Sequence, residues 1–528
     1  MILRSVFFAG LAAGTLLATG CASVSNSGKP SGFQEIVSEA GNKVFPAVVY
    51  INAVAGDMKL GREQSNVVAG SGVLISPDGE MLTNWHVIDK AQSIRCLLND
   101  GRAFQAKIIG SDKDLDLALL KLTLPPGTPP LPFAELAPET LSEGDFVMAM
   151  GAPWGLNRSV SIGIISCASR YLPVNGMYSL WYQTDASISP GNSGGPLVNT
   201  SGKVVGINTL GVRSGGTVGF SIPSTTIRDV LPRLRQYGKV NWAWFGFLLQ
   251  PLRDFNRDIY FNFTDGVIVS GTEPGSPARK AGFLPNDRII AADGRKITVA
   301  TGESMPGFLR MLGLMPFGKA VTFTVVRDGK TFDIALAPVA KGEVEGDESS
   351  CPRWGLTAKA INRFDSPNLY FYRTRGVYLF GVVPYGNAAQ AHLYKDDIIL
   401  SVNGQPIRTL ADLNLAYQNA MKNINETTKA DFVVLRGGQR RQIIMDFSND
   451  IQQSNKRSHT MNRKKLLTLS VLLSAVALSA VPETVSAPRS KTPAAEQEKS
   501  PSSADLSKLN RQLLDKFASS LIDVEYFF

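Results

Sequence analysis

The chain has 528 residues, of which 44% are hydrophobic and 19% are charged, so it has room for roughly three domains of 100–200 residues. This composition excludes a disordered chain, a collagen-like chain and a protein made of many membrane spans. The formal net charge is +9, but no run of five basic residues occurs, and we therefore expect no nucleic-acid binding.

Cysteine and motif content give no indication of a cofactor. The four cysteines are Cys21, Cys96, Cys167 and Cys351. They are too few and too scattered for a disulfide framework, and no CxxC or paired Cys/His spacing indicates a zinc site. No GxxxxGKS nucleotide-binding loop occurs either. We expect neither a metal nor a cofactor, and an activity that does not depend on ATP.

The N-terminal segment 1–21 has the pattern of an export signal. One cation, Arg4, precedes an apolar run, and small residues lead to Cys21. The segment resembles a bacterial lipobox, which implies that Cys21 carries a lipid anchor. Ala18 stands where that pattern most often has Leu, so a plain signal peptide is the alternative. Both interpretations place the protein outside the cytoplasm, with residues 22–32 as a polar tether.

The following two hundred residues indicate a β-rich domain. Residues 33–44 have a helical pattern, but most of the segment consists of short β-rich runs separated by Gly, Pro, Asn and Asp. Many short strands at this spacing predict an all-β fold, and about 200 residues suit two small barrels. The runs include Ala47–Val54, Ser71–Ser76, Asp116–Leu122 and Lys203–Asn208.

An internal repeat follows. The sequence GSPARKAGF, which begins at Gly275, is repeated in similar form as GNAAQAHL from Gly386, an offset of about 110 residues. Each copy is followed by an Asp-apolar-apolar run and then by Asp-Gly or Asn-Gly. Upstream, Phe245-Gly246-Phe247 and Trp354-Gly355-Leu356 keep nearly the same offset. We therefore predict two homologous modules of about 95 residues, joined by an acidic, Ser-containing linker.

The end of the chain contains a second signal-like segment. Residues 461–487 have cations, an apolar run of about 16 residues and a small-residue site, and that run is short for a membrane span of about 20. A segment of this kind inside a chain indicates that the start of another exported protein has been joined to this one, by fusion or by a sequence error. A genuine C-terminal anchor is the alternative.

Three residue types with catalytic potential occur in the β-rich domain. The chain has three histidines, and His392 and His459 lie in the second repeat and the tail, so histidine-dependent catalysis in the first domain must use His86. Asp116 opens an apolar strand, and Ser193 lies in Gly-Asn-Ser-Gly-Gly. The order His, Asp, Ser in a β-rich domain is that of the chymotrypsin-like arrangement.

These residue types suit nucleophilic catalysis. A serine hydroxyl needs a base to take its proton as it attacks, and imidazole can do so near neutral pH. Asp116 would accept the other ring N–H of His86 and fix its tautomer. The glycines around Ser193 would let the backbone aim the N–H groups of Gly191 and Ser193 at the developing oxyanion.

These motifs together resemble the HtrA (DegP-like) family of serine proteases. The matching text is TNWHV, DLDLALLKL, GAPWG, QTDASISPGNSGGPLVN and VGFSIPS, followed by two PDZ-like modules, and it covers residues 33–447. The resemblance implies a mainly β fold: a chymotrypsin-like double β-barrel followed by two PDZ-like α+β domains. It places the acid immediately before the apolar strand, at Asp116, and leaves Asp112 and Asp114 as solvated loop charges.

The expected organisation has five parts after the tether. They are the protease domain at 33–238, the first PDZ domain at 241–340, a linker at 341–351, the second PDZ domain at 352–447 and a tail at 448–528. The resemblance implies an endopeptidase on the periplasmic face of the envelope, acting as a homotrimer on misfolded proteins. The segment between Val54 and Val68 is short where some family members carry a loop that builds hexamers, so we do not expect hexamers.

Site residues outside the triad follow from the same resemblance. In chymotrypsin-like enzymes the base of the specificity pocket lies six residues before the nucleophile, which is Ser187 here. An uncharged base disfavours cleavage after Lys or Arg and favours small apolar residues. In the PDZ-like modules, Phe245, Gly246 and Phe247, and likewise Trp354, Gly355 and Leu356, would hold a peptide's terminal carboxylate. His392 stands where the first copy has Gly282, which puts peptide binding by the second module in doubt.

Two further functions are compatible with the sequence. A chaperone or scaffold could hold unfolded chains, with hydrolysis slow or conditional, and a peptide-binding signalling module could act without hydrolysis.

Trp85 is unusual beside the catalytic histidine, and we expect its indole to pack over the cleft.

Overall fold

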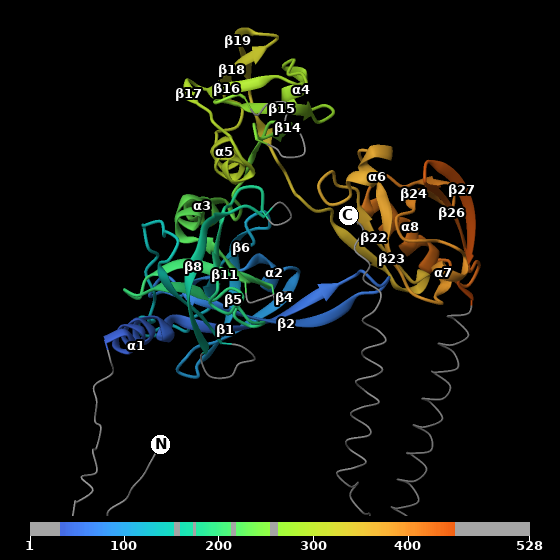
Figure 1. Cartoon of the computed structure of the whole chain (residues 1–528). Helices are drawn as coiled ribbons and strands as arrows, with labels where there is room; N and C mark the ends of the chain where they lie inside the picture. Colours follow the sequence, from blue (N-terminus) through green and yellow to red (C-terminus); the bar gives the residue numbers. More distant parts are fainter. Residues whose placement is uncertain (1–31, 153–158, 173–175, 213–217, 254–261, 449–528) are drawn as a thin grey trace, which may run out of the picture. The chain divides into compact units, whose positions relative to one another are not determined.

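A computed structural model describes residues 32–152, 159–172, 176–212, 218–253 and 262–448 (Figure 1). The lipobox-like segment with Cys21 and the second signal-like segment at 461–487 lie outside the described residues. All described residues belong to one compact unit. No helix among them is long and apolar enough to cross a bilayer.

The N-terminal half begins with a closed six-stranded barrel in the order β1-β2-β3-β6-β5-β4. Helix α1 precedes it, close to the predicted helix at 33–44, and the short helix α2 follows β3. The bounds are α1 Gly32–Val44, β1 Val48–Asp57, β2 Gln64–Leu74, β3 Glu80–Thr83, α2 Trp85–Ile88, β4 Ala91–Leu97, β5 Ala103–Asp112 and β6 Leu117–Leu122.

A second closed barrel has the order β10-β11-β12-β9-β8-β7. Its strands are β7 Phe146–Gly151, β8 Ser159–Arg170, β9 Trp181–Thr184, β10 Pro196–Asn199, β11 Val204–Val212 and β12 Val218–Pro223, and α3 spans Ser224–Tyr237. One hydrophobic cluster contains buried residues of both barrels, such as Leu119 and Ile207. This common core fixes the junction between the barrels, where loops from each can meet.

The next module has a sheet in the order β14-β15-β16-β18-β19, with β17 paired to β16. Its first strand, β13, pairs instead with β20 at the far end of the module. The bounds are β13 Ala243–Trp244, β14 Phe247–Gln250, β15 Val267–Thr272, α4 Pro277–Lys280, β16 Arg288–Ala292, β17 Arg295–Lys296, α5 Met305–Gly313, β18 Val321–Arg327, β19 Lys330–Leu336 and β20 Val339–Ala340.

The last module has the order β21-β22-β23-β24-β26-β27, with β25 paired to β24. The bounds are β21 Glu348–Cys351, β22 Leu356–Ala360, α6 Pro367–Tyr372, β23 Val377–Val382, α7 Asn387–Gln390, β24 Ile398–Val402, β25 Gln405–Pro406, α8 Leu410–Lys422, β26 Lys429–Arg436 and β27 Gln439–Asp446. The last residues of the expected linker therefore form a strand, β21.

A buried ion pair occurs at the same place in both modules. Asp287 and Asp397 are almost completely buried, and each carboxylate accepts from an arginine, Arg327 at 2.5 and 2.7 Å and Arg436 at 2.6 Å for both bonds. Both arginines also donate to a carbonyl in the preceding turn, that of Gly282 or His392. The repeat seen in the sequence is thus a repeat of structure.

Candidate active site

His86 lies on α2, and a buried asparagine fixes the start of that helix. Asn84 caps α2 and is fully buried. Its side-chain amide donates to the carbonyl of Asp116 at 3.0 Å and to the hydroxyl of Thr209, in β11 of the second barrel, at 2.8 Å. Asn84 therefore ties the histidine helix both to the turn before β6 and to the second barrel.

Asp116 lies in the turn between β5 and β6 with its backbone in the left-handed region, at φ +52°, which aspartate tolerates better than most residues. Its carboxylate accepts from Nδ1 of His86 at 2.9 Å and from the backbone N–H of His86 at 3.0 Å. Two donors of one residue thus hold this carboxylate, and its contact with Nδ1 leaves Nε2 as the nitrogen directed elsewhere.

The Ser193 loop is attached to the first barrel through Ser71 of β2. The hydroxyl of Ser71 donates to the carbonyl of Gly191 at 2.6 Å, and its backbone N–H donates to the carbonyl of Ser193 at 2.8 Å. Gly194 has φ +83°, and a Cβ there would lie 2.2 Å from the carbonyl oxygen of Ser71. Only glycine fits this close approach between the two barrels.

The hydroxyl of Ser193 donates to the carbonyl of Thr209 at 3.1 Å. Asn84 bonds to the side chain of the same threonine and to Asp116, so Thr209 and Asn84 link the Ser193 loop to the turn that carries Asp116. Attack with His86 as the base requires the hydroxyl to exchange the Thr209 carbonyl for the imidazole; catalytic hydrogen bonds often tighten only when substrate is bound.

The backbone around the serine presents amide groups. Gly191 has φ +98°, and the N–H of Asn192 is used in a turn, donating to Ser189. Within the part of the chain that the structure describes, the N–H groups of Gly191 and Ser193 have no protein acceptor. Two neighbouring amides of this kind can bind an oxyanion.

A cavity of about 440 Å³ opens beside the histidine. Its lining includes Trp85, His86, Asp116, Trp181 and Thr209, together with Val344 from the linker. Trp85 therefore walls the cleft, as its place in the sequence predicts. The described residues contain no cluster of His, Cys, Asp and Glu that could hold a metal.

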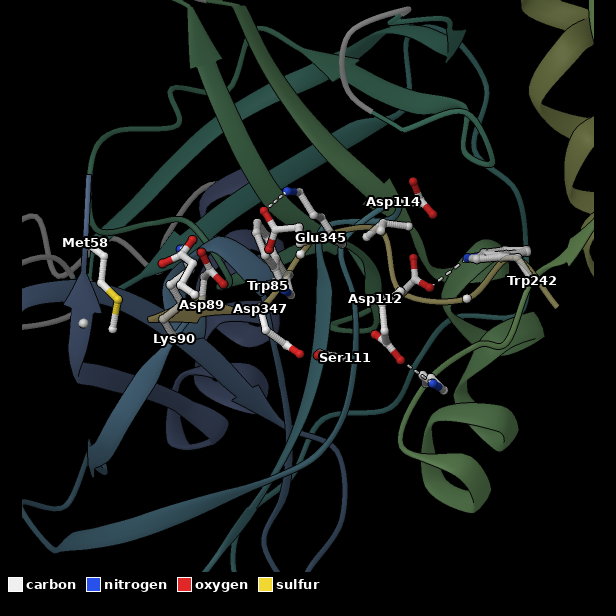
Figure 2. A pocket seen from close by; sticks show the side chains of 18 of the residues that line it. Met58, Trp85, Asp89, Lys90, Ser111, Asp112, Asp114, Trp242, Glu345 and Asp347 are labelled. Atoms are coloured by element: carbon white, nitrogen blue, oxygen red, sulfur yellow. Dashed lines mark hydrogen bonds and ion pairs between the residues drawn. The ribbon is translucent and has the colours of Figure 1, made fainter. Parts of the chain in front are cut away.

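The expectation that Asp112 and Asp114 are solvated is wrong. Asp112 is only 8% exposed, and its carboxylate accepts from the indole N–H of Trp242 at 2.7 Å and from the backbone N–H of Leu115 at 2.9 Å (Figure 2). Burial, reinforced by the neighbouring charge of Asp114, raises the pKa of Asp112 to about 7. The turn that carries Asp116 thus begins with a buried carboxyl group.

Asp114 is held by the linker. Its carboxylate accepts from Nζ of Lys341 at 2.7 Å, and this lysine is only 5% exposed. The ammonium also lies 4.9 Å from the ring centre of Tyr178 and 5.0 Å from that of Phe364. Aromatic faces attract a cation that has lost its water, so Lys341 is bound tightly to the turn before Asp116.

Lys113, in the same turn, has partners on both sides. Its ammonium lies 4.9 Å from the ring centre of Trp85 and forms an ion pair with Glu345 of the linker. Lys113, Trp85 and Glu345 all line a second cavity of about 520 Å³ (Figure 2). No sequence motif marks Trp242, Lys341 or Glu345, because their contacts are with partners more than a hundred positions away.

Ser187, the predicted pocket base, is exposed, and its carbonyl accepts from the hydroxyl of Ser161 at 2.6 Å. The next residue, Ile188, is buried, and a Cβ on Gly219 would lie 2.7 Å from its side chain. The role of Ser187 stays a prediction, while its neighbours Ala186 and Ile188 are buried apolar residues.

The two predicted carboxylate-binding loops have similar backbones. Gly246 and Gly355 have φ +78° and +68°, and the aromatic residues before them, Phe245 and Trp354, are buried in the module cores. Phe247 and Leu356 begin β14 and β22. His392 lies in the turn after α7, where its Nδ1 is 3.3 Å from the hydroxyl of Tyr394.

Family models match three parts of the chain. A trypsin-like peptidase domain matches residues 70–207, and PDZ domains match 245–337 and 345–431. The solved structure of the HtrA-type protease AlgW with a tripeptide is 30% identical, with a TM-score of 0.51 over 58% of this chain and 97% of that one. AlgW with a decapeptide is 29% identical, with a TM-score of 0.50 over 58% and 99%.

Curated relatives match over most of their length. The probable periplasmic serine endoprotease DegP-like of Chlamydia trachomatis is 33% identical over 413 residues, which are 76% of this chain and 80% of the relative. That of Marinomonas sp. is 36% identical over 386 residues, 70% and 77% of the two chains. Given the double barrel, the contact between His86 and Asp116 and these matches, the chain belongs to the HtrA (DegP-like) family of serine endoproteases with two PDZ domains.

Proposed function

We propose that Ser193 is the nucleophile of this endopeptidase, His86 its general base and Asp116 the group that orients His86. Oγ of Ser193 attacks the scissile carbonyl, its proton passes to Nε2 of His86, and the imidazolium then gives this proton to the leaving amine. The contact of 2.9 Å between His86 and Asp116 is the observation that carries the proposal. It fixes the ring with Nδ1 toward the carboxylate and Nε2 free for the proton of Ser193.

The amides of Gly191 and Ser193 would stabilise the tetrahedral intermediate. Neither is used by another protein group among the described residues, and the Ser71 hydroxyl holds the carbonyl of Gly191 on the side of the first barrel. Removing one donor of such a pair typically costs about 3–4 kcal/mol of barrier. Ser71 therefore positions the loop without touching substrate.

We infer a preference for small apolar residues before the scissile bond. Ile188 is buried against the backbone of Gly219, and Ser187 at the predicted base carries no charge. Asp185, the nearest acid in this segment, accepts from the backbone N–H of Ile164 at 2.7 Å. Residues 186–189 carry no carboxylate, so a buried lysine or arginine side chain of a substrate would find no opposite charge beside Ser187.

Misfolded or partly unfolded envelope proteins are the substrates we propose, with the PDZ modules binding extended segments or C-termini. PDZ domains bind such peptides as an added strand at a sheet edge, and unfolded chains are the class of protein that exposes them. The predicted carboxylate-binding groups are Phe245-Gly246-Phe247 and Trp354-Gly355-Leu356.

Hydrolysis of casein by wild type and by Ser193→Ala tests the catalytic assignment. We expect a loss of about 10⁶ in turnover for Ser193→Ala and about 10⁴ for Asp116→Asn. Ser201→Ala, in an exposed turn, is the matched control and should keep full activity. If Ser193→Ala hydrolyses casein as fast as wild type, Ser193 is not the nucleophile. If neither protein hydrolyses casein while both suppress aggregation equally, the chain acts as a chaperone.

We further propose that Cys21 anchors the mature protein at the periplasmic face of the envelope and that the protein is a homotrimer. Phe33 of α1 and Phe146 of β7 are both about half exposed and their ring centres lie 5.3 Å apart, and we propose this exposed contact as part of the trimer interface. Intact mass would detect the lipid, and light scattering of wild type against Phe33→Asp would report the oligomer.

A further inference from the structure

Strand β21 occupies the outer edge of the second PDZ sheet. It pairs antiparallel with β22, with Glu348 opposite Lys359, Ser349 opposite Ala358, Ser350 opposite Thr357 and Cys351 opposite Leu356. β22 follows the predicted carboxylate-binding loop, and it is the strand beside which a PDZ ligand adds. A segment of this chain therefore holds the position of a peptide.

The other side of β21 faces helix α8. The hydroxyl of Ser349 bonds to Oδ1 of Asn414 in α8 at 2.5 Å, and just beyond β21 the N–H of Arg353 donates to the hydroxyl of Tyr417 in the same helix at 3.2 Å. β21 thus contacts both β22 and α8. It lies in a groove with a strand on one side and a helix on the other.

The side chains and the end of β21 also resemble those of a bound C-terminus. Alternate residues point to one face of a strand, so Cys351 and Ser349 both face the module interior, and Cys351 is fully buried in its core. The carbonyl of Cys351 accepts from the N–H of Gly355 at 3.1 Å. An amide of the predicted carboxylate-binding loop thus holds the last carbonyl of β21.

Charges fix the beginning of β21. Glu348 accepts from Nζ of Lys359 in β22 at 3.2 Å and from Nζ of Lys90 in the protease domain at 2.6 Å. The side chains of Glu348 and Lys359 are only 7% and 6% exposed. Lys359 also pairs with Asp365 at 3.0 Å, so the buried Glu348 joins a small charge cluster that holds the beginning of β21 against β22.

In the described part of the first PDZ module, no strand takes the place of β21. Its β14, the counterpart of β22, ends the sheet path and pairs with β15. Leu248 in β14 is 49% exposed. The residues before its loop, β13, pair with β20 instead. Among the described residues, then, the first module has an open strand edge where the second has β21.

We propose that Glu348–Cys351 is a tethered ligand of the second PDZ module and keeps its peptide groove closed. An outside peptide must displace β21, so its apparent affinity falls by the fraction of molecules in which the groove is open. The displacing ligand is an extended peptide with a free carboxylate, an apolar last residue and Ser two residues before it, which copies Cys351 and Ser349. The proposal deepens the peptide-binding part of the proposed function and does not depend on proteolysis.

The test uses the full chain in an inactive Ser193→Ala background. The probe is the peptide Gly-Asp-Glu-Ser-Ser-Val with a free carboxylate, which follows the linker text with Val in place of Cys351; the same peptide with a C-terminal amide is its control. Hydrogen exchange followed by mass spectrometry reports the protection of β14 and of β22 with α8 separately. Peptide titrations give an apparent Kd at each module.

Glu348→Lys opens the groove by placing a cation beside Lys359 and Lys90. Glu343→Lys makes the same change of charge in the same linker, at an exposed residue whose partner is Lys239, and is the matched control. We expect the apparent Kd of the probe for the second module, measured from the protection of β22 and α8, to be at least tenfold lower in Glu348→Lys than in wild type or Glu343→Lys. Equal affinity in all three proteins, or protection of β22 in wild type at the affinity of Glu348→Lys, overturns the proposal.

A milder pair of variants covers the case in which Glu348→Lys unfolds the module. Ser349→Ala removes the bond to Asn414, whereas Ser349→Thr keeps the hydroxyl. We expect about threefold to fivefold tighter probe binding in Ser349→Ala and wild-type binding in Ser349→Thr, since one hydrogen bond contributes about 1 kcal/mol. No difference between the two variants contradicts the tethered ligand, whatever the outcome of the casein assay.

Discussion

The two PDZ modules share a scaffold but differ in what their N-terminal residues do. In both, a buried aspartate accepts from an arginine of a neighbouring strand, Asp287 from Arg327 in β18 and Asp397 from Arg436 in β26. In both, a glycine with positive φ lies directly before the strand beside which a ligand would add, β14 or β22. In the first module the preceding residues pair with β20. In the second, β21 folds back along β22.

The N-terminal and C-terminal ends of the first module both contact the turn that carries Asp116. Trp242, just before β13, donates to Asp112, and Lys341, just after β20, pairs with Asp114. The N–H of Lys341 also donates to the carbonyl of Trp242 at 2.8 Å. The comparison teaches that homologous cores can keep one ligand edge open and close the other, because the flanking segments, not the cores, decide the edge.

The largest expected effect tests the scaffold that the modules share. Asp287→Ala and Asp397→Ala each leave a half-buried arginine without its carboxylate, and each should destabilise its own module by about 3–5 kcal/mol. Denaturation followed by module-resolved hydrogen exchange measures both. Asp333→Ala, at an exposed position of β19, should change little. A large loss in one module only would break the structural equivalence.

The pH dependence of stability tests the buried contact between Asp112 and Trp242, which lies at the N-terminal end of the first module. Burial raises the pKa of Asp112 from about 4 to about 7, so between these values the folded state holds a proton that the unfolded state has lost. Stability should therefore fall as pH rises from 4 to 7, by up to about 1.4 kcal/mol per pH unit, and then level off.

Asp112→Asn should remove this fall, because the amide does not titrate. Lys341, Asp114 and Trp242 face the same carboxyl group, so Asp114→Asn serves as the comparison that keeps Asp112. Unfolding by denaturant at each pH measures the difference. If wild type and Asp112→Asn have parallel profiles, the carboxyl group is not protonated in the folded protein.

The C-terminal end of the first module should affect catalysis. Lys341→Met removes the ammonium between Asp114, Tyr178 and Phe364, so the turn that carries Asp116 loses an anchor. We expect kcat to fall about tenfold, or ~1.4 kcal/mol, with KM nearly unchanged, and Lys341→Arg to restore part of it. A change in KM alone would mean that the linker acts on substrate access and not on the turn.

The smallest expected effect concerns the turn after the short helix in each module. Gly282 has φ +90° with open space around its Cα, so Gly282→Ala should cost about 1 kcal/mol from the backbone alone. His392 has φ +60°, and His392→Gly should stabilise by up to about 1 kcal/mol. Thermal unfolding measures both, and changes of the same sign would contradict equivalent turns.

His392 shows what the sequence could and could not indicate about the second module. Its replacement of the glycine put peptide binding by the second module in doubt, but its carbonyl accepts from Arg436 as that of Gly282 accepts from Arg327. The turn is therefore equivalent in both modules. What closes the second groove is β21, which the sequence presented only as an acidic linker.

The sequence by itself determined the family, the double barrel, the repeat and the order of His86, Asp116 and Ser193. Short-range patterns carry this information: alternation in strands, glycines where a Cβ would clash, and motifs of a few residues. The position of Asp116 immediately before an apolar strand was enough to distinguish it from Asp112 and Asp114 as the partner of His86.

Only the tertiary structure decided what surrounds these residues. That Asp112 is buried under Trp242, that Lys341 holds Asp114 and that Glu348 anchors a strand in the second groove are contacts between residues far apart in the chain. From sequence alone, a charged residue in a loop or linker is expected to be solvated, because most such residues are hydrogen-bonded to water. It becomes a buried contact only when folding brings an opposite charge or an aromatic face to it, and that pairing has no local pattern.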